Sequence, residues 1–232
     1  MNWKTIKGII FDYGGTLDSR GVHWSEVLWA GWQHAGVDVT KEQFREAYVH
    51  AERALAKSPI ILPEDNFLTL LRKKVKIELE FLGLYSPESC ETIAQYCYQA
   101  AKECIEESRP VLDALSERYP LVLVSNFYGN VSAVLADFDL LRYFPKIIES
   151  AVVGVRKPDP AIFQLGVDAL GLPAQEVLVV GDSLKKDILP AESIGCQTAW
   201  LKGKGWTSDE DAQTHPSQIP SLASLIGEIN QL

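Results

Sequence analysis

Three aspartates directly follow short apolar segments and could act together. Asp12 ends the segment KGIIFD, and Asp182 and Asp187 lie in GDSLKKD, which follows the apolar run VLVV. Clustered carboxylates repel one another unless a cation joins them, and hard oxygen ligands suit Mg²⁺. These three residues therefore predict a magnesium site, provided that the fold brings them together.

A second set of residues has the chemistry of a phosphate site. Ser125 and Asn126 end the segment PLVLVSN, and Lys157 lies in VRKPDP. A hydroxyl group, an ammonium group and the backbone N–H groups of a glycine turn all suit a bound phosphate. A carboxylate beside that phosphate can attack it and form an aspartyl-phosphate. Together the two sets indicate phosphoryl transfer.

The elements that must position these residues alternate along the chain. Short segments rich in Val and Ile predict parallel strands that are covered on both faces, and amphipathic stretches between them predict helices. This alternation favours an α/β fold with a doubly wound, Rossmann-like parallel sheet, whose ligands bind beyond the carboxyl ends of adjacent strands. We expect strands at 7–12, 120–126, 146–150, 177–182 and 196–201, and helices at 108–118, 128–138, 160–170, 185–194 and 220–231.

The segment 20–105 interrupts this alternation. It contains no convincing strand and predicts four helices, at 23–35, 40–57, 64–83 and 87–107. Ser86 and Pro87 form a typical helix start, with Ser86 as the cap and Pro87 at the first position. We therefore expect a core domain formed by 1–19 and 106–232, with a helical domain, 20–105, inserted after the first strand. The polar stretch 203–218 is expected to be irregular.

Composition excludes several classes of protein. The net charge is −9 and the sequence contains no cluster of Lys and Arg for a phosphate backbone, so we expect no nucleic-acid partner. The apolar runs are too short to span a bilayer and no signal peptide is evident, so we expect no membrane association and a cytoplasmic location. Cys90, Cys97 and Cys104 recur every seven residues, roughly 10 Å apart on a helix, which is too far for a disulfide. We expect all of the cysteines to be small core residues.

The chain resembles the haloacid dehalogenase (HAD) superfamily. FDYGGTLDS is similar to the first motif of that superfamily, VSNF to the second, RKPDP to the third and GDSLKKD to the fourth. Each motif alone is weak, but the four occur in order across nearly the whole chain, each at a predicted strand end or in the loop that follows. The inserted helices are similar to the helical, C1-type cap that closes over the substrate.

This resemblance implies roles for individual residues. Asp12 would be the nucleophile and a metal ligand, and Lys157 would steady Asp12 and the phosphate. Gly14 would offer its backbone carbonyl to Mg²⁺, with Asp182 as the other acidic ligand and Asp187 supporting the metal site. Phosphate binding would fall to Ser125, the backbone of Asn126, and the turn amides of Gly15 and Thr16. The implied activity is Mg²⁺-dependent hydrolysis of a small phosphorylated metabolite.

One position departs from the pattern of the superfamily. Its phosphatases usually carry a second Asp two residues after the nucleophile, which acts as general acid and base, but here that position is Gly14. A positioned acid or base contributes about 10²–10⁴-fold to the rate. A side chain from the helical insert or the loop entering it could replace it, with the candidates being His23, Asp18, Lys57, His50 and Glu64.

Two alternatives follow from the same departure. A phosphonoacetaldehyde hydrolase-like enzyme also has a small residue at this position and cleaves a C–P bond with a cap lysine, for which Lys57 is the best-placed candidate. The protein could instead be a weak or inactive HAD scaffold that binds a phosphorylated ligand or a protein. The presence of Asp12, Ser125 and Lys157 favours the phosphatase over that scaffold. Dehalogenation is disfavoured, because that branch needs no metal whereas GDSLKKD resembles a metal motif.

Overall fold

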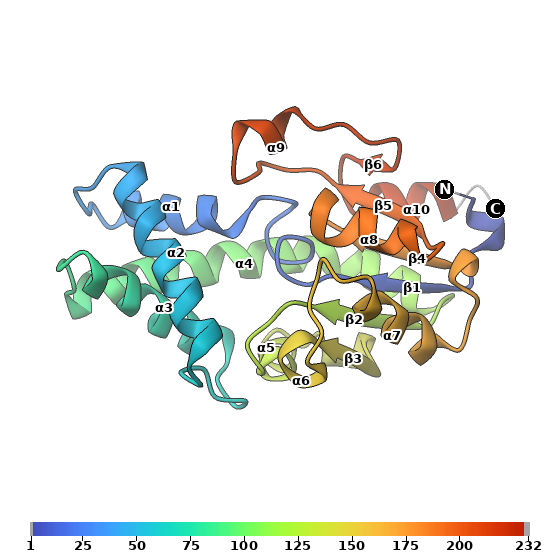
Figure 1. Ribbon diagram of the computed structural model, residues 1–232, viewed down its shortest axis with the longest axis horizontal. Coiled ribbons are helices and arrows are strands. Elements are labelled where there is room, and N and C mark those ends of the chain that lie inside the picture. The colour runs from blue at the N-terminus through green and yellow to red at the C-terminus, as the bar shows by residue number, and fades with distance from the viewer. Residues whose placement is uncertain (1, 230–232) are drawn as a thin grey trace.

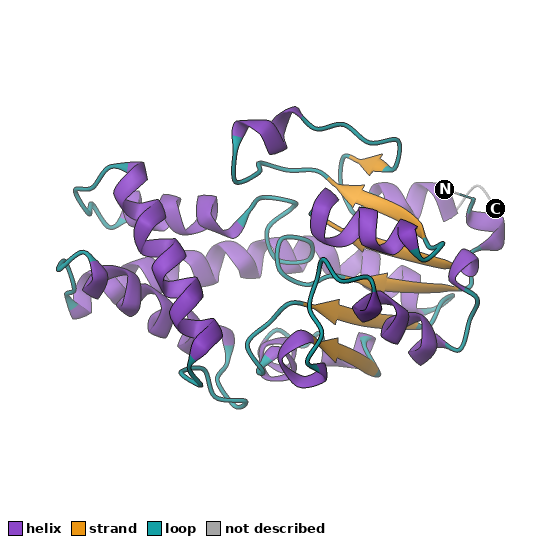
Figure 2. Ribbon diagram, viewed as in Figure 1, coloured by secondary structure: helices purple, strands orange, loops and turns teal. Residues whose placement is uncertain are grey.

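A parallel sheet lies at one end of the molecule and a bundle of helices at the other (Figure 1, Figure 2). The computed structural model describes residues 2–229. The six strands pair in the order β3-β2-β1-β4-β5-β6, and every neighbouring pair is parallel. The strands are β1 Gly8–Phe11, β2 Leu121–Ser125, β3 Lys146–Glu149, β4 Val177–Gly181, β5 Gln197–Leu201 and β6 Gln218–Ile219.

The central position of β1 places Asp12 where the strand order reverses. The chain builds outward from β1 through β2 to β3, and then returns to the other side of β1 with β4. Ile9 is in register with Leu121 of β2 and with Leu178 of β4, so the three strands end at the same edge. Ligands of open α/β sheets bind at such a switch point. The predicted doubly wound sheet is confirmed, and it brings the strand-end residues together.

Helices cover both faces of the sheet, as the continuous apolar runs predicted. Ile10 of β1 faces a core formed with Phe163 of α7 and Ala191 of α8. Phe11, its neighbour, faces the opposite core, which includes Leu112 of α4. The helices in the second half of the chain are α5 Val131–Asp137, α6 Ser150–Val153, α7 Ala161–Leu170, α8 Leu189–Ser193, α9 Ser208–Ala212 and α10 Ser224–Ile229.

Four helices between β1 and β2 form the bundle. They are α1 Trp24–His34, α2 Lys41–Lys57, α3 Phe67–Phe81 and α4 Pro87–Ser116. Each begins at a residue whose side chain accepts a backbone hydrogen bond from the first turn, namely His23, Thr40, Asn66 and Ser86. Such caps satisfy otherwise unpaired N–H groups. The predicted helix start at Ser86 and Pro87 is confirmed.

Helix α4 is longer than the sequence predicted. Two helices were expected, at 87–107 and 108–118, but one continuous 30-residue helix runs from Pro87 to Ser116 and contains Pro110. Its first half packs among α1 and α3, and Val111, Leu112 and Leu115 in its second half are buried against the sheet. A single rigid element therefore joins the bundle to the sheet.

Two further regions refine the sequence interpretation. The stretch 203–218, expected to be irregular, contains α9 and the start of β6. The helix predicted at 185–194 begins as a π-helical turn, Leu184–Ile188, and continues as α8. Short 3-10 helices lie at Trp3–Thr5, Leu141–Tyr143 and Ala174–Glu176. The predicted helix 220–231 corresponds to α10, and its positions 230 and 231 lie outside the described residues.

All four cysteines are buried and free, as expected for small core residues. Across residues 2–229, none of the helices is both long and apolar enough to cross a membrane.

Candidate active site

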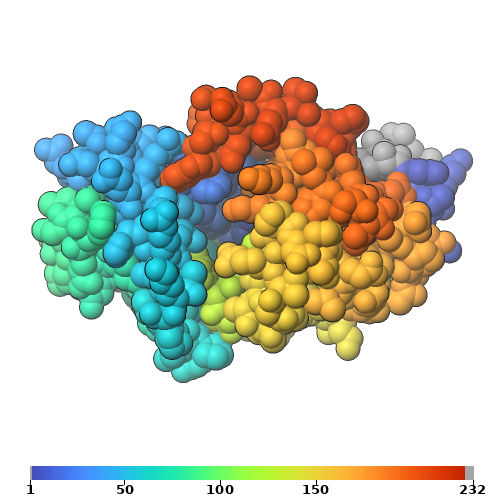
Figure 3. Space-filling view, viewed as in Figure 1, coloured from blue at the N-terminus to red at the C-terminus, as the bar shows by residue number. Residues whose placement is uncertain are grey.

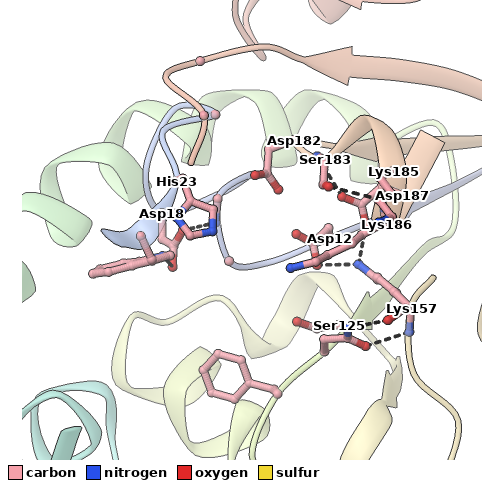
Figure 4. Close-up of a pocket in the computed structure, with 18 of the residues that line it drawn as sticks. Asp12, Asp18, His23, Ser125, Lys157, Asp182, Ser183, Lys185, Lys186 and Asp187 are labelled. Atoms are coloured by element: carbon pink, nitrogen blue, oxygen red, sulfur yellow. Dashed lines mark hydrogen bonds and ion pairs between the residues drawn. The ribbon is translucent and has the colours of Figure 1, made fainter. Parts of the chain in front are cut away.

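Three aspartates and one lysine meet at the carboxyl end of the central strands (Figure 4). Asp12, Asp182 and Asp187 each offer an oxygen atom, and these three atoms lie within 4.8 Å of one another. The Lys157 ammonium contacts Asp12 Oδ1 at 2.6 Å and Asp187 Oδ1 at 2.7 Å. The structure thus brings together the acidic residues and the lysine that the sequence singled out.

Glycines make this close packing of acids possible. A Cβ atom on Gly15, which has a φ of +96°, would lie 2.4 Å from the carboxyl carbon of Asp182. A Cβ on Gly181 would lie 2.5 Å from Cβ of Asp187. Side chains at these positions would push the two aspartates away from Asp12. The glycines therefore fix the separation of the carboxylates as well as the turn.

The turn after Asp12 uses its own amides internally. The Gly15 N–H donates to Asp18 Oδ1 at 2.7 Å, and the Thr16 N–H donates to the carbonyl of Tyr13 at 3.1 Å. The Thr16 hydroxyl lies 3.3 Å from Asp12 Oδ2 and 3.4 Å from Asp182 Oδ1. Sequence analysis assigned the amides of Gly15 and Thr16 to a phosphate. In the structure they stabilise the turn, and the hydroxyl of Thr16 lies between two aspartates.

The predicted phosphate-binding pair, Ser125 and Asn126, lines the same cavity as Asp12. The side chain of Asn126 bonds the backbone of Lys157 on both sides, because its Oδ1 accepts from the Lys157 N–H at 2.9 Å and its Nδ2 donates to the Lys157 carbonyl at 3.1 Å. These bonds hold the loop that carries Lys157 against the end of β2. Sequence analysis assigned Asn126 a role through its backbone and did not reveal this contact, which spans 31 positions of the chain.

The electrostatics of the cluster leave negative charge uncompensated. Burial and the Asp187 charge raise the pKa of Asp12, although Lys157 opposes the shift. Burial and the neighbouring carboxylates hold the pKa of Asp182 well above its usual value. Burial alone would lower the pKa of Lys157, but Asp12 and Asp187 outweigh it and keep the ammonium charged. Three clustered carboxylates with one ammonium fit a divalent cation held by oxygen ligands.

Gly14 leaves room beside Asp12. A Cβ atom built on Gly14 would be near only Trp24, with the indole atoms Cδ1 and Nε1 at 3.9 and 4.0 Å. The Trp24 Nε1–H donates to Asp18 Oδ2 at 3.0 Å. A side chain at position 14 would therefore lie beside the Trp24 indole ring, whose N–H is hydrogen-bonded to Asp18.

Two of the candidate acid/base residues reach the cavity. Asp18 and His23 both line it, and burial raises the pKa of Asp18 to about 7 although bonds from Gly15 and Trp24 oppose the shift. Burial, together with Lys186 and Lys74, lowers the pKa of His23 to about 4. The remaining candidates, Lys57, His50 and Glu64, are exposed and do not line the cavity.

The bundle supplies a wall of the cavity that sequence analysis missed. Tyr48 and Glu52 of α2 and Lys74 of α3 line it, together with Tyr128 from the loop after β2. Lys74 occupies the face of α3 that also buries Leu70, Leu71 and Glu78. A charged residue in the middle of an apolar helix face is the signal that could have identified it.

The cavity has a volume of about 290 Å³, and the surface is recessed between the bundle and the sheet (Figure 3). A group of exposed or half-buried cationic side chains lines it: Arg156, Lys185, Lys186, Lys202 and Lys204. Positive potential at an opening raises the local concentration of an anion. An otherwise acidic protein therefore has a cationic rim around this cavity.

Comparisons with known proteins agree with this architecture. A haloacid dehalogenase-like hydrolase domain-containing protein of Danio rerio is 39% identical over 82 residues, which are 35% of this chain and 34% of that protein. A phosphoglycolate phosphatase of Yersinia pseudotuberculosis is 25% identical over 94% of this chain and 90% of its own length. Other curated relatives match over 25% to 52% of their own lengths.

A solved structure supports the same fold. The HAD-hydrolase YfnB of Bacillus subtilis is 20% identical, with a TM-score of 0.59 over 97% of this chain and 99% of that one. The model of one family, haloacid dehalogenase-like hydrolase, matches residues 6–195 and so includes Asp12, Ser125, Lys157, Asp182 and Asp187. This chain belongs to the haloacid dehalogenase-like hydrolases.

Proposed function

We propose that this protein is a Mg²⁺-dependent phosphatase that acts on a small phosphorylated metabolite through an aspartyl-phosphate on Asp12. The observation that carries the proposal is the convergence of Asp12, Lys157, Asp182 and Asp187 at the switch point of the sheet. The names of relatives add support, since they include glyceraldehyde 3-phosphate, phosphoglycolate and phosphoserine phosphatases. The cationic rim suits an anionic substrate.

Asp12 and Asp182, with the carbonyl of Gly14, are the proposed metal ligands. Asp187 fits a supporting role better, because its Oδ1 accepts from Lys157 and its Oδ2 accepts from the Ser183 N–H at 3.0 Å. Bound Mg²⁺ would neutralise the surplus carboxylate charge and the charge of a transferring phosphoryl group. The solved relative YfnB is described as bound to magnesium, which supports the same assignment here.

The proposed reaction has two displacement steps at phosphorus. Asp12 attacks phosphorus in line with the leaving oxygen, the P–O bond to the leaving group breaks as the leaving oxygen takes a proton from the general acid, and an acyl phosphate forms. Lys157, held by Asn126 and Asp187, stabilises the carboxylate and the phosphoryl oxygens, and Ser125 donates its hydroxyl hydrogen bond to the same group. Water then attacks phosphorus, which releases phosphate and restores Asp12.

We propose Asp18 as the group that replaces the missing second aspartate, ahead of His23. Asp18 lines the cavity and holds the Trp24 indole beside Gly14. His23 is occupied as the cap of α1, where its Nδ1 accepts from the Ser25 N–H at 3.2 Å. The neutral imidazole is a poor proton donor, and its low pKa makes it a weak base.

We propose that the inserted helical domain, 20–105, acts as the cap, and that 1–19 and 106–232 form the core domain. The continuity of α4 across residue 105 gives the cap a rigid attachment. A cap of this kind excludes bulk water and contacts the leaving group. The cap lysine needed for the phosphonoacetaldehyde reaction has no support, because Lys57 is remote from the cavity. Lys74, which does line the cavity, is held as an ammonium by Glu52.

The test is phosphate release from a panel of phosphate esters with Mg²⁺ or with a chelator, alongside Asp12→Asn. The panel includes p-nitrophenyl phosphate, glyceraldehyde 3-phosphate, 2-phosphoglycolate and phosphonoacetaldehyde. We expect Mg²⁺-dependent ester hydrolysis that is lost in Asp12→Asn. We also expect that quenching the reaction with acid traps a phosphoryl group on Asp12. Activity that persists in a folded Asp12→Asn protein would exclude Asp12 as the nucleophile. Release from phosphonoacetaldehyde alone would indicate C–P cleavage, and no turnover at all would indicate a binding scaffold.

A further inference from the structure

An ion pair between a buried lysine and a half-buried glutamate lines the cavity on the side of the helical bundle. The Lys74 ammonium contacts Glu52 Oε1 and lies 4.2 Å from the centre of the Tyr48 ring. The hydroxyl of Tyr128 donates to the same Glu52 oxygen at 2.9 Å. The side chain of Lys74 is only 6% exposed, whereas that of Glu52 is 35% exposed. Two helices of the bundle and one loop of the sheet domain therefore meet at a polar cluster.

The cluster retains unused hydrogen-bonding capacity. An ammonium has three N–H donors, whereas Lys74 interacts with two partners, Glu52 and Tyr48, which leaves donor capacity unused. Lys74 and Tyr128 both donate to Oε1 of Glu52. The other carboxylate oxygen of Glu52, Oε2, has no hydrogen-bond partner within residues 2–229. Lys74 and Glu52 both line the cavity, so unused donor capacity lies beside an unused acceptor, and a hydroxyl group matches both.

We propose that Lys74, Glu52 and Tyr128 form a leaving-group subsite that selects uncharged, hydroxylated leaving groups over leaving groups that carry a carboxylate. The preferred substrates are then sugar and polyol phosphates. A substrate hydroxyl accepts from Lys74 and donates to Glu52 Oε2. This inference rests on the proposed phosphatase function and deepens it.

Charge balance argues against a carboxylate at this position. The Lys74 ammonium is already neutralised by Glu52, so a second carboxylate would meet no net positive charge there and would lie beside an existing negative one. The cationic rim residues Lys185 and Lys186 are exposed, so solvent and salt screen their attraction.

An apolar leaving group is disfavoured for a different reason. It would cover the free donors and acceptor of the cluster without bonding them, and sites built to bond a hydroxyl reject analogues that lack it. The size of the cavity, about 290 Å³, suits a compact leaving group. A hydroxylated chain satisfies the cluster without adding charge, because each hydroxyl group both donates and accepts a hydrogen bond.

The experiment compares substrates that differ only by CH₂OH against carboxylate. The pairs are 2-hydroxyethyl phosphate with 2-phosphoglycolate, racemic glycerol 1-phosphate with racemic 3-phosphoglycerate, and ribitol 5-phosphate with 5-phosphoribonate. The readout is the ratio of kcat/KM for the hydroxyl member to that for the carboxylate member. For the wild-type protein we expect a ratio of at least about 10 for the best pair, since burying an unpaired charge is strongly disfavoured.

Two variants of opposite charge change should move this ratio in opposite directions. Glu52→Gln keeps an acceptor for Lys74 and Tyr128 but removes the negative charge, so the freed ammonium should admit a carboxylate and the ratio should fall about tenfold or more. Lys74→Gln leaves Glu52 uncompensated, so turnover of the carboxylate member should fall further than that of its partner. Tyr128→Phe removes one hydrogen bond without changing charge and should raise KM for the hydroxyl member.

Glu91→Gln is the matched control. Glu91 pairs with Arg72 between α4 and α3, on an exposed surface outside the cavity, so its loss should leave the ratio unchanged. A purely structural role for the cluster predicts lower melting temperatures with an unchanged ratio in all variants, and that result would overturn the inference. So would a wild-type protein that hydrolyses p-nitrophenyl phosphate but no hydroxyl member of any pair. Failure of the proposed function is distinct, because then p-nitrophenyl phosphate is not hydrolysed either.

Discussion

At the scale of single residues, Gly14 is the position that departs from the pattern of the superfamily's phosphatases. It stands two residues after Asp12, and a Cβ there would meet only the Trp24 ring at ordinary contact distances. The backbone φ of Gly14 is not in the left-handed region, unlike that of Gly15. A larger residue at position 14 is therefore compatible with the turn, which makes the missing aspartate directly testable.

Gly14→Asp is expected to raise kcat for alkyl phosphates by about tenfold or more, because an acid at position 14 protonates a poor leaving group more readily than Asp18, whose two oxygens already accept hydrogen bonds from Gly15 and Trp24. The gain for p-nitrophenyl phosphate should be much smaller, since that leaving group departs without protonation. The measurement is kcat for both substrate types in Mg²⁺. Gly14→Asn is the control, because it adds a similar side chain that is not an acid. Equal rates for the wild-type protein and the Gly14→Asp variant, with both folded, would show that Asp18 already supplies the acid as effectively as an aspartate at position 14.

At the scale of elements, α3 carries an unusual buried face. Lys74 and Glu78 lie four residues apart among Leu70, Leu71 and Val75, and both are almost fully buried. Lys74 has Glu52 as a partner, whereas Glu78 has only a bond from Trp32 Nε1 at 3.3 Å, and its Oε1 has no hydrogen-bond partner within the described residues. Burial raises the pKa of Glu78 to about 7, although Lys74 opposes the shift.

This shift gives the bundle a pH-dependent stability with a definite sign. A carboxyl group whose pKa rises from 4.5 to about 7 on folding contributes stability that is fully present below pH 4.5 and is lost as the pH rises through about 7. Glu78→Gln should remove that loss. We therefore compare the free energy of unfolding of the variant with that of the wild type, and expect this difference to favour the variant by about 1–3 kcal/mol more at pH 8 than at pH 5. The measurement is urea unfolding at both values. Parallel pH dependences in the two proteins would contradict a protonated Glu78.

At the scale of the whole molecule, the bundle and the sheet domain meet around the cavity. Tyr128 bonds Glu52, the Lys204 carbonyl accepts from the His23 N–H at 2.7 Å, and Arg45 donates to the Trp206 carbonyl at 2.6 Å. The segment after β5 lies over the gap between the two ends of the molecule in Figure 1. The cavity is therefore enclosed by three chain segments that are distant in the sequence.

Metal binding should stabilise the whole fold, because the proposed ligands come from the loops after β1 and β4. At Mg²⁺ concentrations about 100-fold above Kd, the melting temperature of the wild-type protein should rise by about 5 °C or more. Asp182→Asn should abolish this response. In chelator at pH 8 the variant should be at least as stable as wild type, because it removes a carboxyl group whose pKa is raised by burial and by the neighbouring Asp187 and Asp12. The measurement is thermal unfolding with Mg²⁺ and with chelator.

Asp209→Asn provides the control for this experiment, since Asp209 is an exposed acid in the first turn of α9 and lies outside the acidic cluster. It should respond to Mg²⁺ as the wild-type protein does. An Asp182→Asn protein that remains stabilised by Mg²⁺ to the wild-type extent would place the metal elsewhere.

The sequence alone determined the elements and the strand-end chemistry. Apolar runs rich in Val and Ile predicted five of the six strands, and periodicity with capping residues predicted the four helices of the bundle. The sequence also predicted that Asp12, Ser125 and Asp182 lie close together, because neighbouring parallel strands end at one edge of a sheet. Each of these inferences depends on patterns within about 20 consecutive residues, where local sterics and burial dominate.

Only the tertiary structure decided which side chains face one another. The bonds from Asn126 to Lys157, the contact of Glu52 with Lys74 and Tyr128, and the unbroken course of α4 through Pro110 all depend on packing between distant segments. Local patterns carry no information on such pairs, because the energy that fixes them arises when buried polar groups must find partners in the assembled core. The residues at the carboxyl ends of the strands could thus be derived from the sequence, whereas the cavity wall that contains Lys74, Glu52 and Tyr128 could not.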